Sequence, residues 1–77
     1  MEELRKKVEQ MIIEILEIPQ DSVIENNIED VGINSLSYVR LIINIESEFG
    51  ISVPDELLSL KMLPSIDDIV AYITINT

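Results

Sequence analysis

Apolar residues recur at steps of three and four over the longest segments of this chain, which is the spacing of one face of an α-helix. The pattern predicts a first helix over Glu2–Glu17. Pro19 ends it, because the residue before a proline is pushed out of helical backbone angles. The pattern predicts a second helix over Ser35–Phe49, with Gly50 as its C-cap.

In the C-terminal third of the chain, the pattern predicts one short helix and one longer helix. Asp55–Leu60 can form a short third helix after Pro54. A last helix begins after Ser65, its predicted N-cap, with Asp68 three residues later as in a capping box. Its apolar stripe consists of Ile66, Ile69, Val70 and Ile73. The stretches "GISV" and "YITIN" alternate like strands, but the helical spacing of the longer segments is the better signal.

A long connection, residues Gln20–Ile33, joins the first two helices. Loops of this length are uncommon and often functional. We expect this one to be held across the helices by its apolar residues, which are Val23, Ile24, Ile28, Val31 and Ile33. The predicted fold is therefore all-α: a small bundle of three main helices and a short third one.

The composition excludes several classes of site. The 77 residues suit a single domain, residues 1–77. Cysteine and histidine are absent, so disulfides, His/Cys zinc sites and histidine-based triads are excluded, and we expect no metal.

The charge bears on partners and location. A net charge of −10 argues against nucleic acid and favours partners with basic docking surfaces. No apolar run is long enough to span a membrane, and the acidic start is unlike a secretory signal, so we expect a cytoplasmic protein without membrane insertion. A monomer is the default expectation.

The second helix has more apolar faces than a bundle core requires. Tyr38, Leu41, Ile42, Ile45 and Phe49 form an ordinary core stripe on a helical wheel. A second patch lies beside Ser35 on the same wheel and has Glu46 within it; its members are Leu36, Val39 and Ile43. Either this helix is buried on nearly all sides, or the patch is a docking surface.

Ser35 at the start of this helix has three possible roles. Either Asn34 or Ser35 could cap the helix. A nucleophile is disfavoured, because no histidine can take its proton, nothing places Lys61 beside it, and "GINSL" lacks the G-x-S-x-G elbow. As an attachment point, the hydroxyl would hold a phosphate ester at the positive end of the helix, after a turn permitted by Gly32.

The segment "EDVGINSLSYVRLIINIESEFGISVPDELL", with "LPSIDDIVAYI" after it, resembles the acyl carrier and peptidyl carrier family over nearly the whole chain. The resemblance implies a right-handed, up-and-down four-helix bundle. It implies that Ser35 carries 4′-phosphopantetheine through a phosphodiester. The thiol of that arm would hold acyl, malonyl-type or aminoacyl groups as thioesters, and the chain itself would catalyse nothing.

The resemblance also implies where the arm and the partners bind. Beside Ser35, we expect Gly32, Asn34 and Leu36 to adjoin the arm. The expected partners are a phosphopantetheinyl transferase, acyl- or aminoacyl-loading ligases, and synthase-type enzymes. We expect their contacts on and after the second helix, at Leu36, Val39, Arg40, Ile43, Glu46, Asp55 and Glu56.

Two features depart from the family pattern. Asn34 stands where the family usually has an aspartate before the serine. Ser37, Arg40 and Ser47 stand where fatty-acid-type relatives often have acidic residues. The resemblance as a whole implies a free-standing carrier for fatty-acid-type, polyketide or nonribosomal-peptide synthesis, and these departures make a specialised pathway at least as good an expectation as the general fatty-acid one. The alternative is a non-catalytic helical adaptor that binds a partner through Leu36, Val39 and Ile43 without a prosthetic group.

Overall fold

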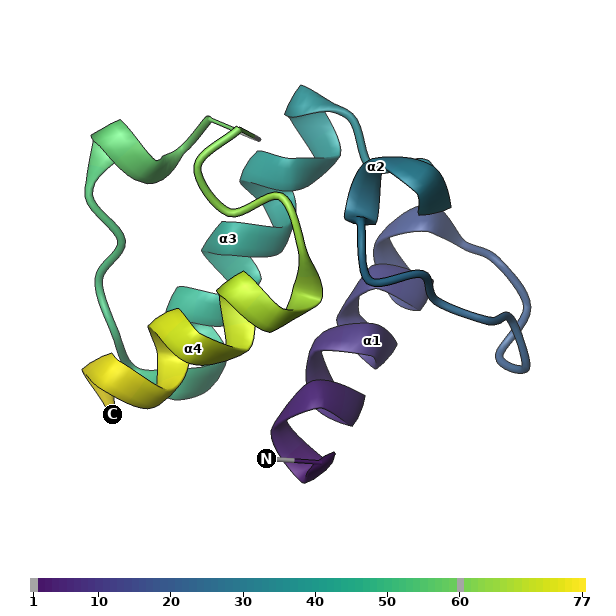
Figure 1. Ribbon diagram of the computed structural model, residues 1–77, viewed down its shortest axis with the longest axis horizontal. Coiled ribbons are helices and arrows are strands. Elements are labelled where there is room, and N and C mark those ends of the chain that lie inside the picture. Colours follow the sequence, from purple (N-terminus) through teal and green to yellow (C-terminus); the bar gives the residue numbers. More distant parts are fainter. Residues whose placement is uncertain (1, 60) are drawn as a thin grey trace.

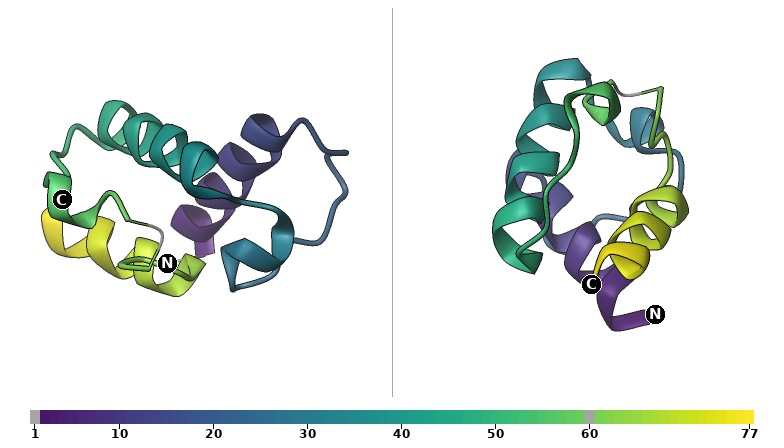
Figure 2. Two further views of the ribbon diagram at one scale, coloured as in Figure 1. Left: turned by 90° about the horizontal axis from the view of Figure 1, so that it is seen from above. Right: turned by 90° about the vertical axis from the view of Figure 1, so that its left-hand side faces the viewer.

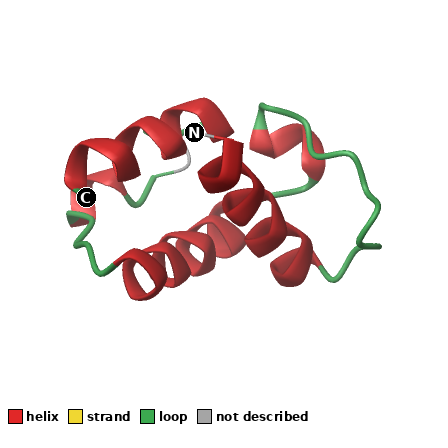
Figure 3. Ribbon diagram, turned by 90° about the horizontal axis from the view of Figure 1, so that it is seen from below, coloured by secondary structure: helices red, strands yellow, loops and turns green. Residues whose placement is uncertain are grey.

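The computed structural model describes residues 2–59 and 61–77, and this part of the chain is an all-α bundle (Figure 1). Its elements are α1 (Glu2–Leu16), α2 (Ile28–Val31), α3 (Ser35–Phe49), the 3₁₀ turn η1 (Asp55–Leu57) and α4 (Ile66–Asn76). Figure 3 shows helices and loops alone, and no strand occurs among the described residues beyond one isolated bridge between Asn27 and Ser65. The predicted all-α fold with three main helices is confirmed; the single domain over residues 1–77 stays a prediction.

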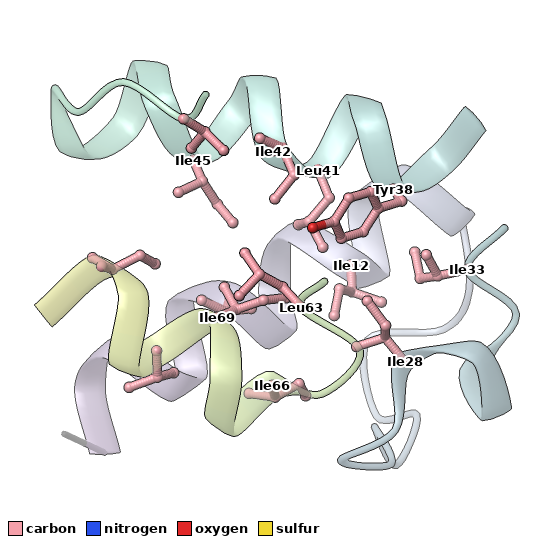
Figure 4. Packing of buried hydrophobic residues seen from close by; sticks show 14 residues of the cluster. Ile12, Ile28, Ile33, Tyr38, Leu41, Ile42, Ile45, Leu63, Ile66 and Ile69 are labelled. Atoms are coloured by element: carbon pink, nitrogen blue, oxygen red, sulfur yellow. The ribbon is translucent and has the colours of Figure 1, made fainter. Parts of the chain in front are cut away.

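The three long helices share one aliphatic core. α1 contacts both α3 and α4, and the views in Figure 2 show the three helices around a common centre. Figure 4 shows side chains from all of these helices and from the loops meeting there. Fully burying one such aliphatic side chain contributes about 1.5–3 kcal/mol. The most deeply buried are Val8, Ile12, Ile28, Tyr38, Leu41, Ile42, Ile45, Ile66, Ile69 and Ile73.

The end of α1 was predicted within one residue. The helix stops at Leu16, and Glu17 takes a left-handed backbone conformation with φ of 54°. The N–H of Ile18 donates to the carbonyl of Ile13 at 3.2 Å, which is the closing bond of a Schellman motif. α1 therefore ends with a defined turn, and Pro19 follows it.

The long connection is held across the bundle, as predicted. Ile28 and Ile33 are buried, and Ile24 and Val31 pack against the core. Backbone bonds also tie the loop to the start of α4: Ile28 N–H donates to Pro64 O at 3.1 Å, and Ile66 N–H donates to Asn26 O at 2.8 Å. The expectation is wrong for Val23, whose side chain is 83% exposed.

Helix α2 lies within this connection and was not predicted. Asn27 caps it, because its side-chain oxygen accepts from the N–H of Glu29 at 3.0 Å. Gly32 ends it in a left-handed conformation. These cap signals were present in the sequence, but a helix of a single turn leaves too few positions for a period to be recognised.

Arg5 connects α1 to the start of α4 and to the long loop. Its guanidinium donates to Asp67 at the start of α4 and to the side-chain oxygen of Asn26 at 3.4 Å. It also pairs with Glu9 on α1. The Asn26 oxygen accepts in turn from the N–H of Asp67 at 3.1 Å. This network holds the loop, α1 and α4 together.

The segment between α3 and α4 is less helical than predicted. The expected helix Asp55–Leu60 is reduced to the turn η1, Asp55–Leu57, and Leu60 lies outside the described residues. Three side chains hold the segment through its backbone. Tyr38 Oη donates to Leu57 O at 2.8 Å, Tyr72 Oη donates to Ser52 O at 3.2 Å, and Glu46 Oε2 accepts from Val53 N–H at 2.8 Å.

The predicted start of α4 is confirmed. Ser65 Oγ accepts from the N–H of Asp68 at 3.1 Å, and the serine hydroxyl donates to the Asp68 carboxylate at 2.9 Å. The second bond joins two side chains, so it replaces the backbone bond of a standard capping box. The predicted stripe is buried along its whole length, from Ile66 to Ile73.

We predict that Tyr38→Phe lowers the free energy of unfolding by about 1 kcal/mol, because it removes a hydrogen bond at a buried side chain and leaves the Leu57 carbonyl without that donor. Urea denaturation followed by circular dichroism measures the change. Tyr72→Phe is the matched control, because it removes the same kind of bond at a more exposed position and should cost less. An equal loss in both variants would contradict this prediction.

The same tyrosine should make stability fall at alkaline pH. Burial raises the pKa of Tyr38 to about 12, against about 10 for an unfolded tyrosine. The folded state therefore retains a proton that the unfolded state loses between these values. The contribution of the protonated Tyr38 side chain to the free energy of unfolding is complete below the unfolded pKa. It is lost as pH rises through the folded pKa. From about pH 10 to about pH 12, wild-type stability should fall more steeply than that of Tyr38→Phe; parallel curves would contradict the assignment.

Candidate functional site

Ser35 is the first residue of α3, and its side chain is exposed. Asn34 performs the capping: its Oδ1 accepts from Ser37 N–H at 3.0 Å, and Ser37 Oγ accepts from Asn34 N–H at 2.9 Å. The two residues complete a reciprocal capping box. The Ser35 hydroxyl has no hydrogen-bond partner among residues 2–59 and 61–77, so it is available at the surface. The sequence had left Asn34 and Ser35 as alternative caps, and the part of Ser37 in the capping box was not predicted.

The chain is anchored immediately before the serine. Ile33 is buried, and its N–H donates to Ile28 O at 3.1 Å. Gly32 has φ of 116°, a conformation that side chains rarely adopt. A Cβ at Gly32 would meet Leu16 Cδ1 at an ordinary distance of 3.9 Å, so the backbone angle, not space, requires glycine. The buried Ile33 and the left-handed Gly32 therefore fix the position of Ser35 at the N-terminus of α3.

The start of α3 lacks the acidic residues that begin the other helical elements. Each of the others has two in its first turn: Glu2 and Glu3, Glu29 and Asp30, Asp55 and Glu56, Asp67 and Asp68. The first turn of α3 has none. The first helical bond runs from Tyr38 N–H to Asn34 O at 2.8 Å, so the N–H groups of Ser35 and Leu36 precede the helical ladder. The positive end of the α3 dipole therefore remains free to stabilise an anion.

The end of α1 approaches the start of α3 (Figure 2). An open cleft of about 270 Å³ lies between them, beside the serine. The structure brings Gly32, Asn34 and Leu36, three of the predicted arm-binding residues, together with Arg40 in its wall. The α1 residues in the wall were not anticipated, because sequence spacing does not show which end of α1 meets α3. The lining residues are Ile15, Leu16, Gly32, Asn34, Leu36, Ser37 and Arg40.

The second apolar patch of α3 faces solvent at two of its three positions. Leu36 is 70% exposed and Ile43 is 55% exposed, whereas Val39 is half-buried. The interpretation that α3 is buried on nearly all sides is therefore wrong. Arg40 is exposed next to this patch.

The acidic residues predicted to contact partners are not gathered around this patch. Glu46 is half-buried and its carboxylate accepts from the Val53 N–H, so it stabilises the turn after α3. Asp55 and Glu56 are exposed, but they lie on η1 rather than on α3. The contact role of these three residues stays a prediction.

Neither a metal site nor a membrane span was found in the described part of the chain. No group of acidic side chains there could hold a metal ion. None of the described helices has the length and apolar character needed to cross a bilayer.

Comparison with known proteins agrees with the resemblance in the sequence. The family model described as "Phosphopantetheine attachment site" matches residues 6–73. An acyl carrier protein of Zymomonas mobilis is 31% identical over 75 residues, which cover 95% of this chain and 94% of that protein. An acyl carrier protein of Thermotoga maritima is 39% identical, with 94% of this chain and 89% of that protein covered.

A third relative gives the same result: an acyl carrier protein of Campylobacter hominis is 38% identical, with 92% of this chain and 90% of that protein covered. These matches extend over nearly the full length of each protein, and they include the loop, α3 and α4 together. The chain belongs to the phosphopantetheine-binding acyl carrier protein family, whose members are carriers without catalytic activity of their own.

Proposed function

We propose that Ser35 is the attachment residue for 4′-phosphopantetheine, and that this chain carries acyl, malonyl-type or aminoacyl groups between enzymes. The observation that supports this most directly is the exposed Ser35 hydroxyl. It is not needed as a helix cap, because Asn34 and Ser37 form the capping box at the start of α3. Within the family, a phosphodiester at such a hydroxyl is the link to the arm. When bound, the arm supplies a thiol, which a chain without cysteine lacks.

The residues around Ser35 fit a phosphodiester anion. The first turn of α3 has no carboxylate to repel it. The free N–H groups and dipole at that helix end favour negative charge, by about 0.3–1 kcal/mol at an exposed site. Asn34 adds no charge where an aspartate would add one. Leu36 and Gly32 lie on either side in the sequence and line the adjoining cleft, where they can contact the arm.

For the pathway, we propose a specialised carrier for polyketide, nonribosomal-peptide or unusual acyl cargo rather than the general fatty-acid carrier. The support is the composition of α3: Ser37, Arg40 and Ser47 occupy positions that are often acidic in fatty-acid-type relatives. The relatives identified above are named only as acyl carrier proteins. A cytoplasmic location belongs to the same proposal.

A second candidate is the adaptor that binds a protein partner and needs no arm. The observation in its favour is the solvent-facing pair Leu36 and Ile43. It assigns no role to the free Ser35 hydroxyl or to the acid-free start of α3, so it explains less of the site. The two candidates differ in whether the partner requires Ser35.

We predict that a phosphopantetheinyl transferase with coenzyme A will increase the mass of the purified protein by one phosphopantetheinyl group. In this reaction Ser35 Oγ forms a bond to the phosphorus next to pantetheine. The phosphorus–oxygen bond to the nucleotide breaks, adenosine 3′,5′-bisphosphate leaves, and the hydroxyl proton passes to a base of the transferase. Intact-protein mass spectrometry measures the product.

Ser35→Ala should show no mass gain while keeping its helical circular dichroism. Ser47→Ala is the matched control: it removes an exposed hydroxyl from the same helix and should be modified like wild type. An unchanged wild-type mass, with a transferase shown to be active on another carrier, would contradict the carrier proposal. Modification of Ser35→Ala would contradict the assignment of the site alone.

A further inference from the structure

Arg40 lies at the edge of the exposed apolar face of α3, where this face meets the polar side of the helix. Leu36 precedes it by four residues and Ile43 follows it by three, so both adjoin it on the helix surface. Leu36 and Ile43 are largely exposed, and so is Arg40. The result is a small apolar surface with one positive charge at its edge, on a protein whose net charge is −10.

No acidic residue neutralises Arg40 within the described structure. Its neighbours three and four positions away are Leu36, Ser37, Ile43 and Asn44, none of them acidic. Among residues 2–59 and 61–77, the Arg40 side chain makes neither an ion pair nor a hydrogen bond.

The two acidic residues of α3 are engaged elsewhere. Glu46 accepts from the Val53 N–H, and Glu48 pairs with Lys7 at 3.4 Å. Arg5 on α1, by contrast with Arg40, is paired with Asp67 and Glu9. Arg40 is therefore a free guanidinium that keeps all of its donors for an outside partner.

Covering this face would change the energetics of Arg40. In water the guanidinium is well solvated and needs no partner. An enzyme that buries Leu36 and Ile43 removes water from Arg40 as well, and a desolvated charge is costly unless it is paired. A carboxylate is the acceptor whose geometry matches the guanidinium fork. A lysine or arginine at that point would instead be repelled.

Any enzyme that modifies Ser35 must approach this face. Arg40 follows Ser35 by five residues, a separation of about 7.5 Å along the helix axis. Such an enzyme would contact the start of α3 over more than this length, because standard protein interfaces cover about 800 Å² on each partner. Arg40 also lines the cleft beside Ser35 together with Asn34 and Leu36, so an enzyme that reaches Ser35 across this cleft covers Arg40 as well.

We propose that the phosphopantetheinyl transferase acting on this chain presents a carboxylate to Arg40, beside an apolar depression for Leu36 and Ile43. This inference rests on the proposed attachment of the arm at Ser35. It adds one acidic contact to the basic docking surface that the sequence led us to expect. The overall negative charge attracts a basic enzyme surface at long range, while the contact at Arg40 requires the opposite charge. Arg40 is thus a specificity-determining residue for the partner.

The test measures kcat/KM for arm transfer by the transferase of the source organism. Three chains are compared: wild type, Arg40→Glu and Lys6→Glu. Lys6 is the matched control, because it is exposed, lies near the opposite end of α1 from the cleft, and changes the net charge by the same amount. Circular dichroism establishes that each chain is folded.

Arg40→Glu should lower kcat/KM about tenfold at low salt, with a smaller loss at high salt, whereas Lys6→Glu should stay within about twofold of wild type. Replacing the opposing acidic residue of the transferase with lysine should then restore activity on Arg40→Glu and reduce it on wild type.

Equal effects of Arg40→Glu and Lys6→Glu, or a gain of activity in Arg40→Glu, would overturn this inference while the arm attachment stands. A wild-type chain that the active transferase leaves unmodified would overturn the proposed function, and this inference with it.

Discussion

The burial of one side of α3 is the constraint on which the rest of the structure depends. Tyr38, Leu41, Ile42 and Ile45 all point into the core, and α1 packs against the same helix (Figure 4). Their burial determines the rotation of α3 about its axis. Leu36, Arg40 and Ile43 then face solvent, because they lie on the opposite side of the helix. The packing that stabilises the domain therefore also exposes the surface available to partners.

The start of α3 divides two tasks between neighbouring side chains. The side chains of Asn34 and Ser37 each accept a hydrogen bond from the backbone N–H of the other and so cap the helix. Ser35, which lies between them in the sequence, stays exposed. A serine that capped its own helix would have its oxygen engaged with backbone N–H groups. The absence of acidic residues from this one first turn belongs to the same arrangement, since a carboxylate there would compete with a bound anion.

Sequence periodicity predicted the long elements well, because long amphipathic helices carry many consistent signals. The bounds of α3, its Gly50 cap and the buried stripe of α4 all agree with the structure. The exposed serine and its anion-compatible position also followed from residue types and order. The family resemblance added the arm and its chemistry, which no periodicity could supply.

The shorter features depended on tertiary contacts, and there the sequence was insufficient. Helix α2 has a single turn. The predicted third helix is only the turn η1, whose Leu57 carbonyl accepts a hydrogen bond from Tyr38. Glu46 belongs to the patch on a helical wheel, yet its carboxylate turns to the Val53 N–H. Val23 is apolar but points into water. Helix α2 is too short to show a period, whereas the course of the segment after α3, the orientation of Glu46 and the exposure of Val23 depend on contacts that helical periodicity does not describe.

The segment between α3 and α4 gives this protein a built-in optical reporter. The chain contains no tryptophan and only two tyrosines, so its near-ultraviolet absorption and dichroism come almost entirely from them. Both phenol groups donate to carbonyls of this one segment, Tyr38 to Leu57 and Tyr72 to Ser52. Rearrangement of the segment, when a cargo or an enzyme arrives, can therefore be followed in the unlabelled protein.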